Sequence, residues 1–180
     1  EQAVPDGNFP TLKSPNPEEP SALQMAIAKA NTIQADLVMA TDPDADRVGI
    51  AVRDARGEFV LLNGNLTAAI LIAYLLKSWK DKGLLKGREF IVKTIVTTEL
   101  LKTMADTYDV DCPDVLTGFK YIAEIIREKE GIKTFIGGGE ESYGYLVCDF
   151  VRDKDAVMSC CLFAEACAWA REQGMSAFEM

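Results

Sequence analysis

Residues 37–47 read LVMATDPDADR, and no other stretch of the chain says more about what this protein is. The apolar run over residues 37–40 predicts a short buried strand, and a loop rich in carboxylates follows it directly. Asp42, Asp44 and Asp46 are spaced at i, i+2 and i+4. Because alternate side chains of an extended backbone point the same way, these three carboxylates are expected to converge on one point.

Three bare carboxylates held together would repel and raise one another's pKa, and a divalent cation removes that cost. A ligand set made only of oxygen suits Mg²⁺, Mn²⁺ or Ca²⁺ and does not suit zinc. An EF-hand would need Gly at loop position 6 and Glu at position 12. Counted from Asp42, those positions hold Arg47 and Arg53, so the EF-hand is excluded. The alternative to a metal site is a solvated acidic turn. Arg47 favours the metal, because an arginine beside a metal site suits a phosphate that bridges both.

On both sides of this loop, apolar patterns of strand and helix periodicity alternate along the chain, which is typical of the α/β class. We expect mixed sheets flanked by helices. Thr97 is the expected N-cap of a helix ending at Tyr108, and Asp153 is that of the last helix. Glycines 137–139 follow a strand and are expected to let the backbone approach a ligand. The predicted strands cover residues 37–40, 48–52, 58–62, 90–96, 110–116, 133–136 and 143–147, and the first two predicted helices cover 21–32 and 66–79.

Composition excludes several classes of protein. The chain has 180 residues, no histidine and a net charge of −9, with no block of basic residues. The charge argues against nucleic acid as a partner, and the lack of histidine removes Ser-His-Asp triads and zinc sites built on His. The longest near-continuous apolar stretch, residues 66–76, is shorter than the ~20 residues that a membrane helix needs, so no membrane partner is expected. Five cysteines without a C-x-x-C pair, and no signal-peptide pattern, indicate reduced thiols in a cytoplasmic protein.

The acidic loop, TDPDADR, resembles the metal loop of the α-D-phosphohexomutases, the superfamily of phosphoglucomutases and phosphomannomutases. Other motifs of this superfamily stand in the same order and cover almost the whole chain. They are PDGNFP at residues 5–10, SPNPE at 14–18, TGFK at 117–120, the G-E-x-S sugar-recognition motif as GEESYG at 139–144, and RDKD at 152–155.

The resemblance implies roles for residues in the metal loop. Asp42, Asp44 and Asp46 would hold Mg²⁺ against a phosphoserine, and Arg47 would face the active site. The motif that carries the phosphoserine is absent from these 180 residues, as is the phosphate-binding loop of the last domain. The resemblance therefore implies no catalytic nucleophile within the chain.

The resemblance also implies a substrate site for a phosphorylated sugar. Glu140 and Ser142 would bind sugar hydroxyls, and Thr117 and Lys154 would be further substrate-binding residues. A carboxylate accepts hydrogen bonds from two neighbouring hydroxyls, which suits this role. The roles of Lys120 and Arg152 stay open.

The implied architecture is an internal fragment of a multi-domain phosphohexomutase. Residues 1–62 would be the later part of the metal-loop domain, residues 63–180 would be the sugar-recognition domain, and the partners would be the remaining domains of the same chain. The parent would interconvert hexose 1-phosphate and hexose 6-phosphate through a phosphoserine and a bisphosphate intermediate, with phosphoglucomutase favoured, and the isolated fragment would be inactive. Phosphomannomutase and pentose-phosphate mutase are alternatives. A non-catalytic metal- or carbohydrate-binding module, or an interaction domain with a solvated acidic loop, is an alternative of another class.

Overall fold

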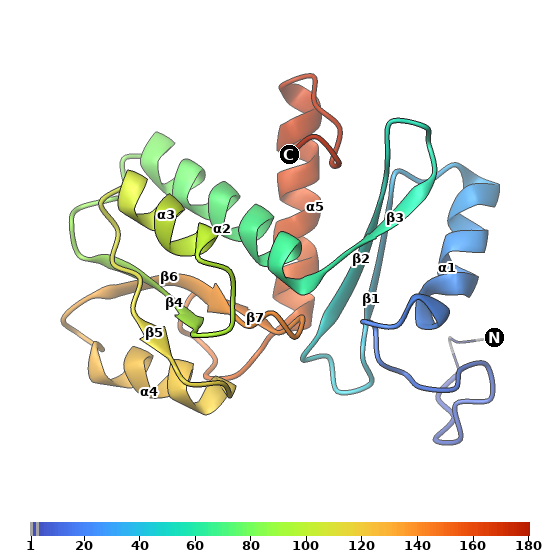
Figure 1. The fold of residues 1–180 in the computed structure, drawn as a ribbon, viewed down its shortest axis with the longest axis horizontal. Coiled ribbons are helices and arrows are strands. Elements are labelled where there is room, and N and C mark those ends of the chain that lie inside the picture. The colour runs from blue at the N-terminus through green and yellow to red at the C-terminus, as the bar shows by residue number, and fades with distance from the viewer. Residues whose placement is uncertain (1, 3) are drawn as a thin grey trace.

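Two β-sheets lie side by side, and helix α5 stands between them (Figure 1). The computed structural model describes residue 2 and residues 4–180. The helices are α1 (Pro20–Ile33), α2 (Gly64–Asp81), α3 (Leu100–Thr107), α4 (Phe119–Glu128) and α5 (Ala156–Glu172). The strands are β1 (Leu37–Thr41), β2 (Val48–Arg53), β3 (Phe59–Leu62), β4 (Glu89–Thr94), β5 (Asp114–Val115), β6 (Thr134–Gly139) and β7 (Tyr145–Val147).

The first sheet is antiparallel, with strand order β1-β2-β3. Its central strand β2 is buried on both faces. Because successive side chains of a strand point to opposite faces, those of β2 pack alternately in two different cores. Ala51 faces α1 and packs with Leu23, whereas Val48, Ile50 and Val52 join the large core that α2 and α5 share. The first sheet is therefore held to the second by buried apolar side chains as well as by the chain itself.

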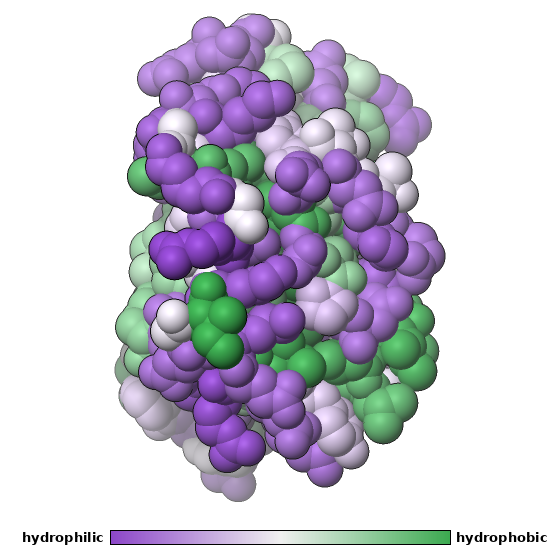
Figure 2. All heavy atoms as spheres, turned by 90° about the vertical axis from the view of Figure 1, so that its left-hand side faces the viewer, coloured by the Kyte–Doolittle hydropathy of each residue, from purple (hydrophilic) through white to green (hydrophobic). Residues whose placement is uncertain are grey.

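The second sheet is mixed, with strand order β5-β4-β6-β7. Strand β4 runs parallel to β5 and β6, and β7 runs antiparallel to β6. Helix α4 covers one face through Phe119 and Ile122, whereas α2, α3 and α5 pack on the other. The α/β class and the expected mixed sheet flanked by helices are confirmed. Figure 2 shows the face at the left of Figure 1, where the second sheet lies. This face carries mostly hydrophilic side chains, with apolar ones scattered between them.

The glycine triplet lies inside β6, so the expectation that it follows the strand is wrong. All three glycines are buried between neighbouring strands. A Cβ on Gly138 would lie 2.4 Å from the carbonyl oxygen of Val92, which is far inside van der Waals contact. The missing side chains let β4, β6 and β7 pack closely.

Two helix starts are capped by side chains. Oδ1 of Asn63 accepts a hydrogen bond from the backbone N–H of Leu66 at 2.9 Å, so Asn63 is the N-cap of α2. Oδ1 of Asp155 does the same for the N–H of Met158 at 2.9 Å. The prediction of Asp153 as the cap of the last helix is wrong by two residues, and Asp153 instead binds a neighbouring lysine.

Two elements near the sheet edge are shorter than the sequence predicts. Helix α3 begins at Leu100, and Thr97 does not cap it, because the Thr97 hydroxyl binds the loop after β6. The strand expected over residues 110–116 is reduced to Asp114 and Val115. The five cysteines are free, with Cys112 buried and Cys148 and Cys161 exposed. Among the residues that the structure describes, no helix is long and apolar enough to span a bilayer.

Candidate functional site

Asp42, Asp44 and Asp46 form a cluster of carboxylates at the end of β1. Each offers one oxygen, and these oxygens lie within 4.8 Å of one another. A tight turn brings them together, closed by a hydrogen bond from the Asp42 N–H to the Arg47 carbonyl at 3.2 Å. Ala45 has the left-handed φ of 57° within this turn. The carboxylates converge as expected, but the expected extended backbone is wrong.

Asp42 is the buried member of the cluster and organises the turn. Its Oδ1 accepts hydrogen bonds from the backbone N–H groups of Asp46 at 3.0 Å and Arg47 at 2.9 Å, and its Oδ2 accepts one from Nε of Arg47 at 3.0 Å. Burial disfavours the charged form of Asp42, but the hydrogen bonds, led by the Arg47 N–H, outweigh it and lower its pKa. The carboxylate therefore stays ionised.

Asp46 has an unsatisfied oxygen. Its Oδ1 is buried without a hydrogen-bond partner among the described residues, and Nε of Arg47 lies 3.5 Å away. Burial raises the pKa of Asp46, although Lys154 opposes this shift. Asp44 is exposed beside it. A buried carboxylate oxygen without a donor, next to two further carboxylates, fits a hard divalent cation.

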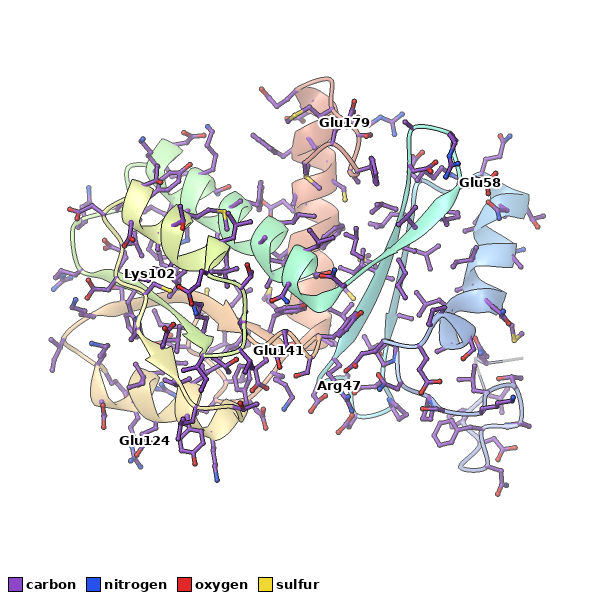
Figure 3. All side chains as sticks on the ribbon, in the orientation of Figure 1. Arg47, Glu58, Lys102, Glu124, Glu141 and Glu179 are labelled. Carbon is purple, nitrogen blue, oxygen red and sulfur yellow. The ribbon has the colours of Figure 1, made fainter. Side chains whose placement is uncertain are left out.

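Arg47 is fixed from two sides. Its Nε binds Asp42, and its Nη1 lies 3.1 Å from Oε1 of Glu18, a residue just before α1. Figure 3 shows Arg47 and Glu141 at the junction of the two sheets. The partner Glu18 was not anticipated from the sequence, because nothing in its local pattern indicates a contact 29 residues away.

Residues 140–144, the 140–144 loop, form a turn closed by a hydrogen bond from the Glu140 N–H to the Gly144 carbonyl at 2.9 Å. The two carboxylates of this loop point to opposite sides. Oε1 of Glu140, which is 6 % exposed, accepts from the Gly118 N–H at 2.8 Å. Oε2 of Glu141 accepts from the hydroxyls of Thr94 and Thr97. Ser142 lies partly buried in the turn.

The acidic loop and the 140–144 loop contact each other directly. The Val48 N–H donates to the Tyr143 carbonyl at 3.1 Å, and Arg47 pairs with Gly144 in an antiparallel bridge. The structure thus brings together the residues expected to bind metal and those expected to bind sugar, although they are almost a hundred positions apart in the sequence.

Lys154, in the segment before α5, contacts the acidic loop through Asp46, and its Cδ would lie 2.2 Å from a Cβ on Gly144 in the 140–144 loop. Its Nζ lies 3.0 Å from Oδ2 of Asp46 and 2.9 Å from Oδ1 of Asp153. The same ammonium group sits 5.3 Å from the centre of the Phe119 ring, within the range of a cation–π contact. Burial is the largest single influence and lowers the pKa of Lys154, but Asp153 and Asp46 together outweigh it, so the pKa is raised.

The remaining candidates lie around the start of α4. Thr117 is exposed and precedes Gly118, whose N–H binds Glu140, so it borders the 140–144 loop. Lys120 is exposed, with its Nζ 4.9 Å from the centre of the Tyr121 ring. Arg152 pairs with Glu130 at 3.2 Å. Lys120 and Arg152 line one groove along α4.

A buried lysine on β4 was not recognised from the sequence. Lys93 is 0 % exposed, and its Nζ lies 2.7 Å from Oε1 of Glu99 and 2.8 Å from Oδ1 of Asp114. The signal that could have revealed it is a single charge in the predicted strand 90–96, whose other residues are apolar apart from Thr94.

Comparison with families of known proteins gives one consistent answer. The family model described as "Phosphoglucomutase/phosphomannomutase, alpha/beta/alpha domain III" matches residues 63–180, and the corresponding domain II model matches residues 1–57. The curated relatives include phosphoglucomutases of two staphylococci. That of Staphylococcus epidermidis is 43% identical over 173 residues, which are 96% of this chain and 31% of the relative. That of Staphylococcus aureus is 45% identical over 156 residues, which are 87% of this chain and 28% of the relative. The chain spans about a third of the length of these relatives.

Solved structures share the fold at lower identity. A phosphoglucomutase/phosphomannomutase family protein from Burkholderia thailandensis has a TM-score of 0.69 and 22% identity, over 94% of this chain and 35% of that one. An N-acetylphosphoglucosamine mutase from Aspergillus fumigatus, solved in complex with GlcNAc-6P and magnesium, has a TM-score of 0.58 and 15% identity, over 80% of this chain and 34% of that one. At such identities the likeness concerns the fold.

Proposed function

Because this chain belongs to the phosphoglucomutase/phosphomannomutase family, we propose that it is part of a phosphohexomutase that interconverts hexose 1-phosphate and hexose 6-phosphate. The observation that carries the proposal is the direct contact of the acidic loop, which holds the three carboxylates, with the 140–144 loop through Arg47 and Gly144. Such a contact allows one bound phosphosugar to meet both. The identity of 43–45% to staphylococcal phosphoglucomutases favours a glucose phosphate as the substrate.

Asp42, Asp44 and Asp46 would hold a magnesium ion. The donor set is all oxygen, and the unpartnered Oδ1 of Asp46 supplies the free acceptor that such an ion requires. When bound, the ion would neutralise negative charge on the phosphoryl group during transfer. Arg47 is oriented by Asp42 and Glu18 through Nε and Nη1, which leaves its Nη2 hydrogens for a phosphate oxygen.

Substrate recognition would fall to the second part of the chain. One oxygen of Glu140 accepts from Gly118, and the other would accept from a sugar hydroxyl. Ser142 would bind a second hydroxyl, and Thr117 borders the same loop. Lys154 would supply a positive charge for a phosphate oxygen at the junction of the two loops. We assign residues 1–62 to the metal-loop domain and residues 63–180 to the sugar-recognition domain.

The serine that carries the phosphoryl group would lie outside these 180 residues, because the phosphoserine motif is not among them. The partners of this chain would then be the other domains of a longer enzyme, in keeping with relatives about three times its length. The isolated chain would orient a phosphosugar but transfer nothing. Free cysteines fit a reducing compartment, so we propose a cytoplasmic enzyme of carbohydrate metabolism.

The test is a coupled assay of the full-length enzyme that carries this chain, supplied with magnesium and with glucose 1-phosphate, mannose 1-phosphate or ribose 1-phosphate in turn. We expect the highest kcat/KM with glucose 1-phosphate and only background activity from residues 1–180 alone. A preference for mannose or ribose phosphate would reassign the substrate. No turnover of any of the three would overturn the mutase proposal and favour a non-catalytic binding module.

A further inference from the structure

The carboxylate of Glu141 binds two buried hydroxyl groups at the end of β4. Oε2 of Glu141 lies 3.2 Å from Oγ1 of Thr94 and 3.0 Å from Oγ1 of Thr97. Thr94 is 0 % exposed and Thr97 is 3 % exposed, so water does not reach these hydroxyls readily. The side chain of Glu141 therefore turns inward to the sheet, and the side chain of Glu140 turns toward α4.

The two hydroxyl hydrogens of Thr94 and Thr97 need a hydrogen-bond acceptor at position 141. The two hydroxyls also lie 2.8 Å from each other, and each carries a single hydrogen. With the Glu141 carboxylate present, both hydroxyls can donate to it. Without an acceptor there, only one can donate, to the other hydroxyl, and one hydrogen is left unpaired in a buried place.

The threonine pair is itself rigidly held. Nζ of Lys93 reaches the carbonyl oxygens of Thr94 at 3.4 Å and Thr97 at 3.3 Å, and its charge is balanced by Glu99 and Asp114. The turn between β4 and α3 thus offers Glu141 a fixed pair of donors. A buried lysine ion-paired to two carboxylates resists rearrangement, because separating the charges would leave the ammonium unpaired.

The backbone of Glu141 is also constrained, at the start of α2. A Cβ on Gly64 would lie 1.7 Å from the carbonyl oxygen of Glu141, so the loop and the helix are in closest contact there. Figure 3 shows Glu141 between the end of β4 and the acidic loop. Glu140 and Glu141 therefore anchor one turn to two different elements, and Ser142 follows directly.

We propose that Glu141 is a positioning residue, whose bonds to Thr94 and Thr97 fix the orientation in which Glu140 and Ser142 meet the sugar. It touches the sheet and not the substrate, so its loss should raise KM for the phosphosugar more than it lowers kcat. The inference rests on the proposed function, since it takes the phosphosugar as the ligand of the 140–144 loop.

The test compares matched variants of the full-length enzyme with saturating magnesium. Glu141→Ala and Thr97→Val should each raise KM for glucose 1-phosphate about tenfold, the value expected when a buried hydrogen-bonded group loses its partner. Glu141→Gln and Thr97→Ser keep an acceptor and a hydroxyl and should recover most of that loss. The double variant Glu141→Ala/Thr97→Val should be little worse than either single one, because both remove the same link.

Hydrogen exchange of the same proteins without substrate tests the inference apart from activity. Glu141→Ala should speed amide exchange in the 140–144 loop and at Val48, whose N–H donates to the Tyr143 carbonyl, and leave helix α1 unchanged. Unchanged exchange in the 140–144 loop, or a KM within twofold of the unsubstituted enzyme, would overturn the positioning role. Equal damage by Glu141→Gln and Glu141→Ala would also overturn it, because a need for charge indicates direct contact with the ligand. An unsubstituted enzyme that turns over no hexose phosphate would instead refute the proposed function, and the exchange result would still decide whether Glu141 anchors the loop.

Discussion

Nζ of Lys154 lies 3.0 Å from Oδ2 of Asp46, so a lysine just before α5 neutralises a carboxylate in the loop after β1. Asp46 is one of the three proposed metal ligands, and its other oxygen has no hydrogen-bond partner among the described residues. A divalent ion at this cluster would be close to the Lys154 ammonium. The ion and the lysine therefore compete for the negative charge of one carboxylate.

Replacing Lys154 with Met should tighten magnesium binding by roughly two- to fivefold, the range of a partly exposed ion pair. Metal titration by calorimetry without substrate measures this directly. Lys120→Met removes a lysine that borders the Tyr121 ring instead and is the matched control, with no expected change. Weaker magnesium binding in Lys154→Met would contradict the competition.

Asp42 and Asp44 should respond differently to the same change. Asp44 is exposed, so Asp44→Asn should weaken magnesium binding and cut kcat severely while the free energy of unfolding stays nearly constant. Asp42 accepts hydrogen bonds from two backbone N–H groups and from Arg47, so Asp42→Asn should also destabilise the fold by about 1–3 kcal/mol. Urea unfolding and metal titration of both variants check this contrast. Normal turnover of Asp44→Asn in magnesium would identify the loop as a mere acidic turn.

Glu140 and Ser142 should affect substrate use and leave metal binding unchanged. A hydrogen bond to a charged group contributes ~1.5–3 kcal/mol, so Glu140→Gln should lower kcat/KM roughly tenfold to a hundredfold. Ser142→Ala removes a neutral partner and should cost about 1 kcal/mol. Steady-state kinetics with parallel magnesium titration separates the two effects. If Glu140→Gln weakened metal binding instead, our assignment of the 140–144 loop would be wrong.

Because of Glu89, the stability of the second sheet should depend on pH in the acid range. Burial disfavours its charged form, but backbone N–H groups of Lys86, Gly87 and Arg88 donate to its Oε2 at 2.8–3.1 Å and lower its pKa. A carboxyl group with a lowered pKa in the folded state stabilises the protein above its unfolded pKa, near 4.5. That stabilisation is lost as the pH falls through the folded pKa.

The neutral variant Glu89→Gln isolates this effect. At pH 7 it should unfold at a lower urea concentration, with a loss of about 1.5–3 kcal/mol. The difference from the unsubstituted protein should shrink as the pH falls below about 4.5. A difference that stays constant down to pH 2 would show that the carboxylate charge contributes nothing there.

Periodicity predicted the fold well where one local signal dominates. Strand β2 alternates apolar side chains over its whole length, and its bounds differ from the prediction by one residue. The sequence pattern predicted the wrong residue where two nearby residues could each cap the same helix. Asp153 and Asp155 have the same capping side chain, and the structure places Asp155 at the N-cap of α5. The glycine triplet is typical of a loop, but it lies inside β6, where Val92 of the neighbouring strand leaves no room for a Cβ on Gly138.

The set of site residues could be predicted, whereas their arrangement could not. Spacing and resemblance brought out the three aspartates, but the turn that joins them depends on Ala45 in a left-handed conformation that its residue type does not favour. The hydrogen bonds of Asp42 stabilise that conformation. The contacts of Glu141 with Thr94 and Thr97 link positions more than forty residues apart, and no sequence pattern within one element could reveal them.

The bridge between Arg47 and Gly144 has a consequence for recombination between homologous genes. A crossover after residue 62 respects the proposed domain boundary, yet it would separate the parental partners of this bridge and of the pair Lys154–Asp46. A hybrid would take the acidic loop from one parent and the 140–144 loop from the other. Its activity would then depend on whether these two loops still fit where they contact each other. Chimeras of distant relatives should therefore lose activity even when each half folds, and exchange of residues 37–53 together with 140–156 should restore it.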